Sequence, residues 1–225
     1  MKNSANNLPL FAESDIRSAT DPFFHETMAR KAGYDLIAGV DEVGRGPLAG
    51  PVAAAAVIFP EGTILQGIKD SKAMTEKARD EAFSLIIQKA LAISVGVVSH
   101  RFIDETNILK ASLEAMKRAV LSLGPAPEYL FVDGIHPVPV NIPQGCLKKG
   151  DQRCLSISAA SVVAKVYRDR IMRSYHERFP EYGFHQNKGY GTKRHFQAIQ
   201  RHGPCPIHRL SFRGVPQVPQ KAELP

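Results

Sequence analysis

Short apolar segments recur along the chain, separated by stretches in which apolar residues return every three or four positions. Each segment is short and is bounded by polar, glycine or proline residues, which is typical of a buried β-strand. The predicted strands cover residues 36–41, 52–59, 93–99 and 129–132. The first ends on the acids Asp41 and Glu42, and Asp133 directly follows the last. The pattern therefore predicts two strands that deliver carboxylates at their C-terminal ends.

The intervening stretches have the spacing of amphipathic helices. A short helix is predicted around residues 23–31, a second is capped by Thr75, and a third begins at Thr106 and stops before Gly124-Pro125. A long helix is predicted over residues 158–179. Its expected inward face consists of Ala160, Ala164, Tyr167, Ile171 and Tyr175.

Two other regions lack a regular pattern: residues 1 to about 20 predict a loose tail, and residues 135–149 an irregular connection. Because strands and helices alternate elsewhere, we expect an α/β fold in which helices cover a sheet. A chain of 225 residues, 44% of them hydrophobic, can bury a full core and is expected to form one main domain.

Composition narrows the class of protein. No stretch of 18 apolar residues predicts a membrane span, and the polar N-terminus lacks the apolar core of a signal peptide. The three cysteines, Cys146, Cys154 and Cys205, are odd in number and lack C-x-x-C spacing. We therefore expect reduced thiols in a cytoplasmic protein without membrane contact.

The positive charge is concentrated in the C-terminal third of the chain. Lys and Arg number 29 against 22 Asp and Glu, a net charge of +7. Residues 1–144 hold 14 basic and 17 acidic side chains, whereas residues 145–225 hold 15 basic and 5 acidic ones. A polyanionic partner such as nucleic acid is a natural interpretation, and a merely solvated basic surface is the alternative.

Four acids carry the candidate chemistry: Asp41, Glu42, Asp133 and Asp151. An acid at the end of an apolar strand can simply end that strand in solvent. Together, however, these carboxylates suit Mg²⁺ or Mn²⁺, and two such ions can assist a phosphoryl displacement. Adjacent strand residues point to opposite faces, so the strand must end or twist between Asp41 and Glu42 if both serve one site.

A glycine-rich segment, Gly44-Arg45-Gly46, follows the first two acids. Glycines let a backbone approach a ligand closely, and Arg45 offers guanidinium donors to a phosphate. Two other interpretations are weaker. His202, Cys205 and His208 supply too few ligands for a structural zinc site. Ser158 and Ser161 with Lys165 lack the turn of a serine nucleophile.

Taken together, these residues closely resemble the signature of type 2 ribonucleases H. The matching motifs, in family order, are DEVGRGPLAGPV at residues 41–52, DSK at 70–72, VDG at 132–134, KGD at 149–151, SISAASVVAK at 156–165, KGYGT at 188–192 and HRLSF at 208–212. The resemblance extends from about residue 36 to residue 213. Type HIII relatives carry an extra N-terminal domain for which the tail here is too short, so the resemblance favours type HII.

The resemblance implies a ribonuclease H-like fold, in which a mixed central sheet is flanked by helices and a helical C-terminal part helps to hold the duplex. It divides the chain into an N-terminal extension (residues 1–33), a catalytic domain (34–213) and a tail (214–225). It also implies that Asp41, Glu42, Asp133 and Asp151 are both catalytic and metal-binding. The substrate-binding residues that it implies are Gly44, Arg45, Gly46, Lys72, Lys165 and Tyr190.

The activity implied is endonucleolytic hydrolysis of the RNA strand of RNA–DNA hybrids, and cleavage 5′ of single ribonucleotides in duplex DNA. Water attacks with the assistance of Mn²⁺ or Mg²⁺ and leaves 3′-hydroxyl and 5′-phosphate ends. We expect a monomer that removes ribonucleotides from DNA. Lys165, Lys188, Lys193 and Arg194 would contact phosphates. The alternatives are a resolvase-like nuclease of the same superfold and a nucleic-acid binding module without activity.

Overall fold

A five-stranded sheet forms the centre of the computed structural model, which describes residues 23–65 and 74–217. The strand order is β3-β2-β1-β4-β5. Pairing is antiparallel between β1 and β2 and between β2 and β3, and it is parallel between β1 and β4 and between β4 and β5. The strands are β1 (Ile37–Val43), β2 (Val52–Ile58), β3 (Ala92–Val98), β4 (Tyr129–Asp133) and β5 (Gln144–Leu147). The expected mixed sheet is confirmed.

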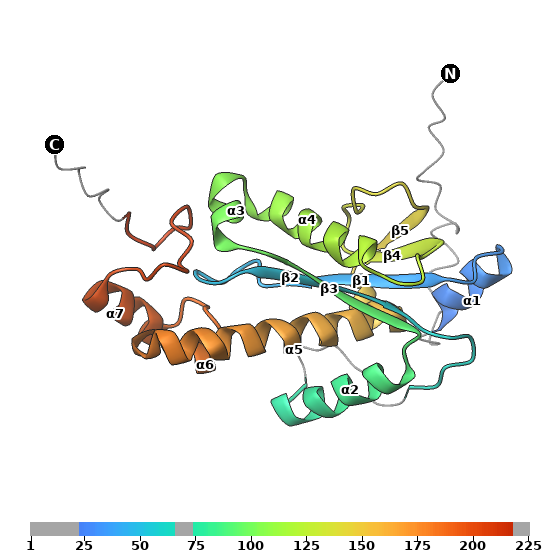
Figure 1. The fold of residues 1–225 in the computed structure, drawn as a ribbon, viewed down its shortest axis with the longest axis horizontal. Coiled ribbons are helices and arrows are strands. Elements are labelled where there is room, and N and C mark those ends of the chain that lie inside the picture. Colours follow the sequence, from blue (N-terminus) through green and yellow to red (C-terminus); the bar gives the residue numbers. More distant parts are fainter. Residues whose placement is uncertain (1–22, 66–73, 218–225) are drawn as a thin grey trace, which may run out of the picture.

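Helices cover both faces of this sheet (Figure 1). One face packs against α4 and the other against α5 and α2, while α6 and α7 lie beyond one end of the sheet. The helices are α1 (Phe24–Lys31), α2 (Glu76–Lys89), α3 (His100–Glu105), α4 (Ile108–Leu121), α5 (Leu155–Arg178), α6 (Phe184–Asn187) and α7 (Lys193–His202). Two short 3₁₀ turns are η2 (Gly150–Gln152) and η3 (Pro180–Tyr182). Among the described residues, no helix combines the length and hydrophobicity that crossing a membrane requires.

Glycines in the strands let the two main helices lie directly on the sheet. A Cβ atom at Gly39 in β1 would stand 2.1 Å from the backbone carbon of Ser156 in α5. A Cβ at Gly96 in β3 would stand 2.1 Å from the carbonyl oxygen of Ala115 in α4. Neither backbone could move aside without disrupting its helix, so both positions require glycine. The N-terminal half of α5 is thereby fixed against β1, the strand that carries Asp41.

Helix α1 is joined to the N-terminal end of α5 by hydrogen bonds to the side chain of Glu26. Its Oε1 accepts hydrogen bonds from the backbone N–H and the hydroxyl of Ser156, both at 2.8 Å. Cys154, the N-cap residue just before α5, supplies no side-chain cap of its own. Glu26 therefore caps α5 from a distant part of the chain, and its negative charge suits the positive end of the helix dipole. The domain boundaries at residues 33 and 213 stay predictions.

Several predicted elements differ in detail from the structure. Residues 135–149 are not entirely irregular, because they contain β5. Before α4 the chain forms an unpredicted short helix, α3, and Asn107 rather than Thr106 caps α4. The first strand does not stop at Asp41 but continues through Glu42 to Val43.

The long helix also differs from its predicted amphipathic pattern. It begins three residues early, at Leu155, and its first half is buried on nearly every side. Tyr167, predicted to face inward, is 43% exposed, whereas Arg168 and Asp169 beside it are buried. The helix lies between the sheet, α2 and the C-terminal segment, so a single inward face does not describe it.

Candidate active site

The sheet brings two of the predicted acids together. In the parallel pair β1–β4, Val40 lies opposite Val132. The next residue of each strand, Asp41 in β1 and Asp133 in β4, therefore occupies the equivalent position on the adjacent strand. Both valines pack on the α4 side. Because strand side chains alternate, both aspartates point to the α5 side, where the hydroxyl of Ser161 donates to Asp41. Asp41 is only 4% exposed.

The side chain of Glu42 points to the opposite face of β1 from that of Asp41, but its carboxylate still interacts electrostatically with Asp133. Its backbone N–H donates to Asp41 Oδ1 at 2.7 Å. Its carboxylate forms an ion pair with Arg45 at 3.1 Å. Burial raises the pKa of Glu42, Arg45 lowers it, and the charge of Asp133 raises it again. The strand does not end between Asp41 and Glu42, yet the carboxylates of both residues interact with Asp133.

The carboxyl group of Asp41 is strongly perturbed by its surroundings. Burial raises the pKa of Asp41 well above its usual range, and the negative charges of Glu42 and Asp133 raise it further. The hydrogen bond from Ser161 acts in the opposite direction but does not offset burial. Buried, mutually repelling carboxylates are stabilised by a cation. The donor set thus fits a hard divalent ion.

Asp151 is placed by a turn that is bonded to Asp133. The backbone N–H of Gly150, which opens η2, donates to Asp133 Oδ1 at 2.7 Å. Asp151 follows directly and is 6% exposed. In the described parts of the chain, no three His, Cys, Asp or Glu side chains stand close enough to enclose an ion. Mg²⁺ is usually held by one or two carboxylates with water and substrate phosphates, so an open site of this kind still fits it.

The Gly44-Arg45-Gly46 segment rests on two buried arginines that the sequence analysis did not assign to the site. Gly44 has φ +95°, and a Cβ there would stand 2.2 Å from Arg168 Nε. Arg209 donates to the carbonyl oxygens of Gly44 at 2.6 Å and of Arg45 at 3.0 Å. Little in the sequence indicated either residue: Arg168 is one of several charged residues in the second half of α5, and only Arg209 lies in a matched motif, HRLSF.

Tyr190 lies beside this segment. A Cβ at Gly46 would stand 3.5 Å from Tyr190 Cε1, and the Tyr190 side chain is exposed at 43%. The backbone N–H of Leu48 donates to the carbonyl of Gly189 at 2.8 Å, which joins the two loops. The structure thus brings together Gly44, Arg45, Gly46 and Tyr190 at the end of β1, next to the acids.

The two predicted lysines have different outcomes. Lys165 lies on α5, one turn beyond Ser161, and its Nζ forms an ion pair with Asp169 Oδ1 at 2.7 Å. Arg79 approaches the other carboxylate oxygen of Asp169 at 3.8 Å. Lys165 is therefore partly buried in a charge cluster rather than free on the surface. Lys72 lies outside the described residues.

The zinc alternative is not supported. His208 accepts from the backbone N–H of Cys205 through Nδ1 at 2.9 Å, and its Nε2 is 3.0 Å from His195 Nε2. His202 is exposed on α7 and takes no part in this network. Burial lowers the pKa of His208 to about 4, which keeps it neutral. These side chains join α7 to the following segment in the C-terminal core.

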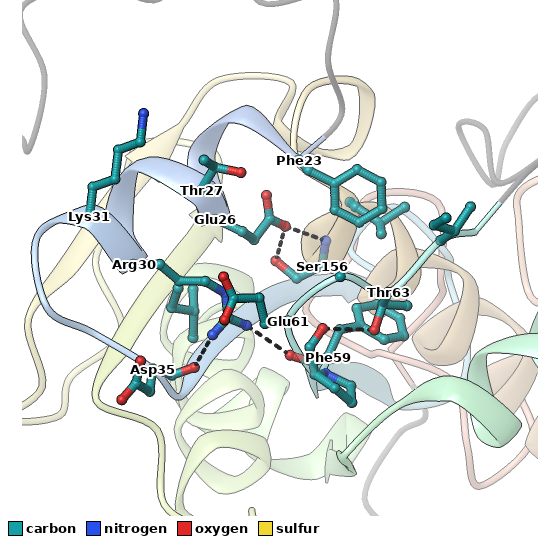
Figure 2. Close-up of a pocket in the computed structure, with 15 residues that line it drawn as sticks. Phe23, Glu26, Thr27, Arg30, Lys31, Asp35, Phe59, Glu61, Thr63 and Ser156 are labelled. Atoms are coloured by element: carbon teal, nitrogen blue, oxygen red, sulfur yellow. Dashed lines mark hydrogen bonds between the residues drawn. The ribbon is translucent and has the colours of Figure 1, made fainter.

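A cleft of about 720 Å³ lies at the other end of β1, away from the acids (Figure 2). It is bounded by α1, the end of β2 and the start of α5, and Glu26, Arg30 and Ser156 line it. Arg30 donates there to the carbonyls of Asp35 at 2.9 Å and Phe59 at 3.1 Å. None of the four acids lines this cleft, so it is separate from the acidic site.

Residues 38–215 match the sequence model of the family described as Ribonuclease HII. This range includes all the acids and both loops. The chain belongs to the ribonuclease HII family. It is accordingly an endonuclease that acts on RNA–DNA hybrids and on ribonucleotides embedded in DNA, as its motifs predicted.

Similar proteins agree with this assignment. A ribonuclease HII of Geobacter metallireducens is 51% identical over 208 residues, which cover 92% of this chain and 96% of that one. One from Geobacter sulfurreducens is 56% identical over 190 residues, covering 84% and 88%. The crystal structure of ribonuclease H2 from Pyrococcus horikoshii has a TM-score of 0.67 at 29% identity, covering 79% of this chain and 94% of that one.

A structure of the ribonuclease HIII named Bst-RNase HIII, solved in complex with Mn²⁺, has a TM-score of 0.61. It is 19% identical and covers 83% of this chain and 70% of that one. At this identity the likeness shows a shared fold.

Proposed function

We propose that the chain cuts the phosphodiester on the 5′ side of a ribonucleotide, using Asp41, Glu42, Asp133 and Asp151 as its catalytic, metal-holding acids. The observation that carries this proposal is the electrostatic coupling of Asp41, Glu42 and Asp133 where β1 and β4 end. Water is the attacking group, and the products carry 3′-hydroxyl and 5′-phosphate ends. The proposed task is removal of ribonucleotides from DNA.

The acids would hold Mg²⁺ or Mn²⁺, the hard cations that suit carboxylate donors. Such ions, when bound, supply positive charge at the phosphate and make water more acidic. The hydrogen bonds from Ser161 to Asp41 and from the Gly150 N–H to Asp133 orient these two carboxylates. Arg45 neutralises part of the charge on Glu42.

The loops next to the acids would recognise the substrate. The 2′-hydroxyl distinguishes RNA from DNA and can both donate and accept a hydrogen bond. The backbone of the exposed residues Arg45 and Gly46, supported by the buried Gly44, can approach it, while the exposed ring of Tyr190 packs against a neighbouring sugar. Both therefore contribute to selection of a ribonucleotide.

Basic residues would hold the duplex without reading its sequence. Lys193 and Arg194 are exposed at the start of α7, shortly after Tyr190 in the chain. Lys72 and Lys165 are kept as proposed substrate contacts. For Lys165 this requires the phosphate to approach a lysine that already pairs with Asp169. We further propose that the enzyme works as a monomer in the cytoplasm, where its thiols, none of which forms a disulfide here, stay reduced.

The test is cleavage of duplex DNA with a single ribonucleotide, with Mg²⁺ and Mn²⁺ compared and the ends of the products mapped. We expect one cut, 5′ of the ribonucleotide, and none without divalent metal. An all-DNA four-way junction serves as the second substrate. Cleavage of the junction would favour a resolvase-like activity instead, and binding without turnover would favour a non-catalytic module.

A further inference from the structure

Arg168 and Arg209 are two fully buried side chains that the proposed chemistry does not use. Both have no exposed surface. Arg168 donates to the carbonyls of Ala49, Pro51 and Lys188, at 3.2, 2.9 and 2.9 Å. Arg209 donates to those of Gly44, Arg45, Gly50 and Pro51, at 2.6, 3.0, 3.0 and 3.2 Å. Every acceptor is a backbone carbonyl.

Such a pair is costly for a protein to bury. Burial lowers the pKa of Arg168 to about 10 and that of Arg209 to about 9. A buried charge is usually paired with an opposite one. Among the described residues, Asp169 and Asp104 supply opposite charge to Arg168 and Arg209 without an ion pair to either. The hydrogen bonds are all accepted by carbonyl groups turned toward the guanidinium groups. The two arginines therefore determine the orientation of the peptide groups around them.

This orientation has a direct effect on the outer side of the loop. In a trans peptide the N–H points away from the C=O. Because the carbonyls of Gly44 and Arg45 turn inward to Arg209, the N–H groups of Arg45 and Gly46 turn outward. Within the described residues, neither N–H donates to another group of the chain. Two adjacent donors are thus presented at the surface beside the acids.

Arg168 connects this loop to Tyr190. Its guanidinium joins Ala49 and Pro51 to Lys188, two residues before Tyr190 in the chain. It also packs directly on Gly44, where any side chain would collide with its Nε. Arg168 therefore joins the Gly44–Pro51 loop, the segment that carries Tyr190, and α5.

We propose that Arg209 and Arg168 are positioning residues for ribose recognition, which act by aiming the N–H groups of Arg45 and Gly46 at the 2′-hydroxyl of the substrate. This inference rests on the proposed function and adds to it. The arginines do not touch the substrate. They determine how well the enzyme distinguishes a 2′-hydroxyl from other 2′ groups, rather than how fast it cuts.

Substitution by lysine tests this role, because lysine keeps the charge but lacks the planar fork that can bind several carbonyls at once. Arg209→Lys and Arg168→Lys are each assayed on two duplexes, one with a ribonucleotide and one with a 2′-fluoro nucleotide at the same position. The Arg45 and Gly46 N–H groups are donors, so the 2′ group must accept, and fluorine accepts a hydrogen bond far more weakly than a hydroxyl oxygen does. The attacking group is water, so the chemistry is otherwise retained. Arg30→Lys is the matched control, since Arg30 also binds two backbone carbonyls but lies at the other end of β1.

The readout is the kcat/KM for the ribonucleotide duplex divided by the kcat/KM for the 2′-fluoro duplex. We expect each variant to lower this ratio about tenfold or more, since misplacement by about 1 Å can cost on the order of a hundredfold. Arg30→Lys is expected to leave it unchanged. Both duplexes are cut by one preparation, so partial unfolding lowers both rates and leaves the ratio unaffected. An unchanged ratio in Arg209→Lys and Arg168→Lys overturns the inference, whereas a wild-type enzyme that does not prefer the ribonucleotide overturns the proposed function.

Discussion

Tyr190 lies against Gly46, close enough that a Cβ atom at residue 46 would stand 3.5 Å from Cε1 of its ring. The ring is nevertheless 43% exposed, so it is in contact with the loop on one side and with solvent on the other. This placement is suited to a residue that positions a sugar and contributes little to the core.

We expect Tyr190→Ala to reduce cleavage at a single ribonucleotide by about a hundredfold, because the sugar beside the cut loses its support. Continuous RNA–DNA hybrid should be affected less, because it can bind in several registers. Tyr190→Phe should retain most activity. Steady-state kinetics on both substrates are compared with melting temperatures. Equal losses on both substrates with a large fall in melting temperature would mean that the ring is only a packing residue.

Asp41→Asn and Asp133→Asn should abolish turnover at saturating metal, because each removes a charge that a hard cation requires. In the presence of chelator, Asp41→Asn should raise the melting temperature, since a buried carboxylate no longer repels Glu42 and Asp133. Asp35→Asn, an exposed aspartate before β1, is the control and should change neither quantity. More than about a tenth of wild-type activity in either site variant would contradict an essential role.

Replacing Lys193 and Arg194 together by glutamine should weaken binding of hybrid duplex without moving the cut. If each contacts one phosphate, the slope of log K against log salt becomes less steep by about 1.8. Binding is measured across a salt series. The control is the double variant Lys110→Gln with Lys117→Gln. Both lysines lie on α4, which covers the face of the sheet opposite to α5 (Figure 1). An unaltered slope would show that the two residues at α7 do not meet the phosphates.

Glu26→Ala should lower the free energy of unfolding by about 1–2 kcal/mol, because the start of α5 loses its cap. The loss should be smaller for Glu26→Gln, which keeps an acceptor for the Ser156 N–H. Urea denaturation measures both, with Glu61→Ala as a control from the same cleft. If Glu26→Ala and Glu61→Ala have equal stability, the bonds to Ser156 contribute nothing to the fold.

The sequence allowed prediction of those parts of the fold that depend on local patterns. Strands β1, β2 and β4 are continuous apolar segments, and Thr75 caps α2 as its position indicated, accepting from the Ala78 N–H at 3.2 Å. By contrast, β5 has four residues that include a glycine, and α3 has six. Segments this short carry too few periods for a pattern to be recognised.

Other features depend on contacts that no local pattern contains. Arg209 donates to the carbonyl of Gly44, which lies 165 residues away in the sequence. Because every residue has a backbone carbonyl, the sequence does not indicate which one accepts such a bond. The acids were identifiable because the strand ends and the family motifs marked them. The hydrogen bonds from Arg168 and Arg209 to the Gly44–Pro51 loop depend on the tertiary structure and could not be predicted from the sequence.

The long separation between Gly44 and Arg209 also orders events during synthesis. The four acids and the groups that orient them, Gly150 and Ser161, have all been synthesised by residue 161. The carbonyls of Gly44 and Arg45 have no guanidinium to bind until residue 209 is added. At about 5–20 residues per second, the ribosome needs roughly 10–30 s to cover that separation. All four acids are therefore synthesised before the arginine that holds this loop, and the support of the loop is the last part of the site to be made.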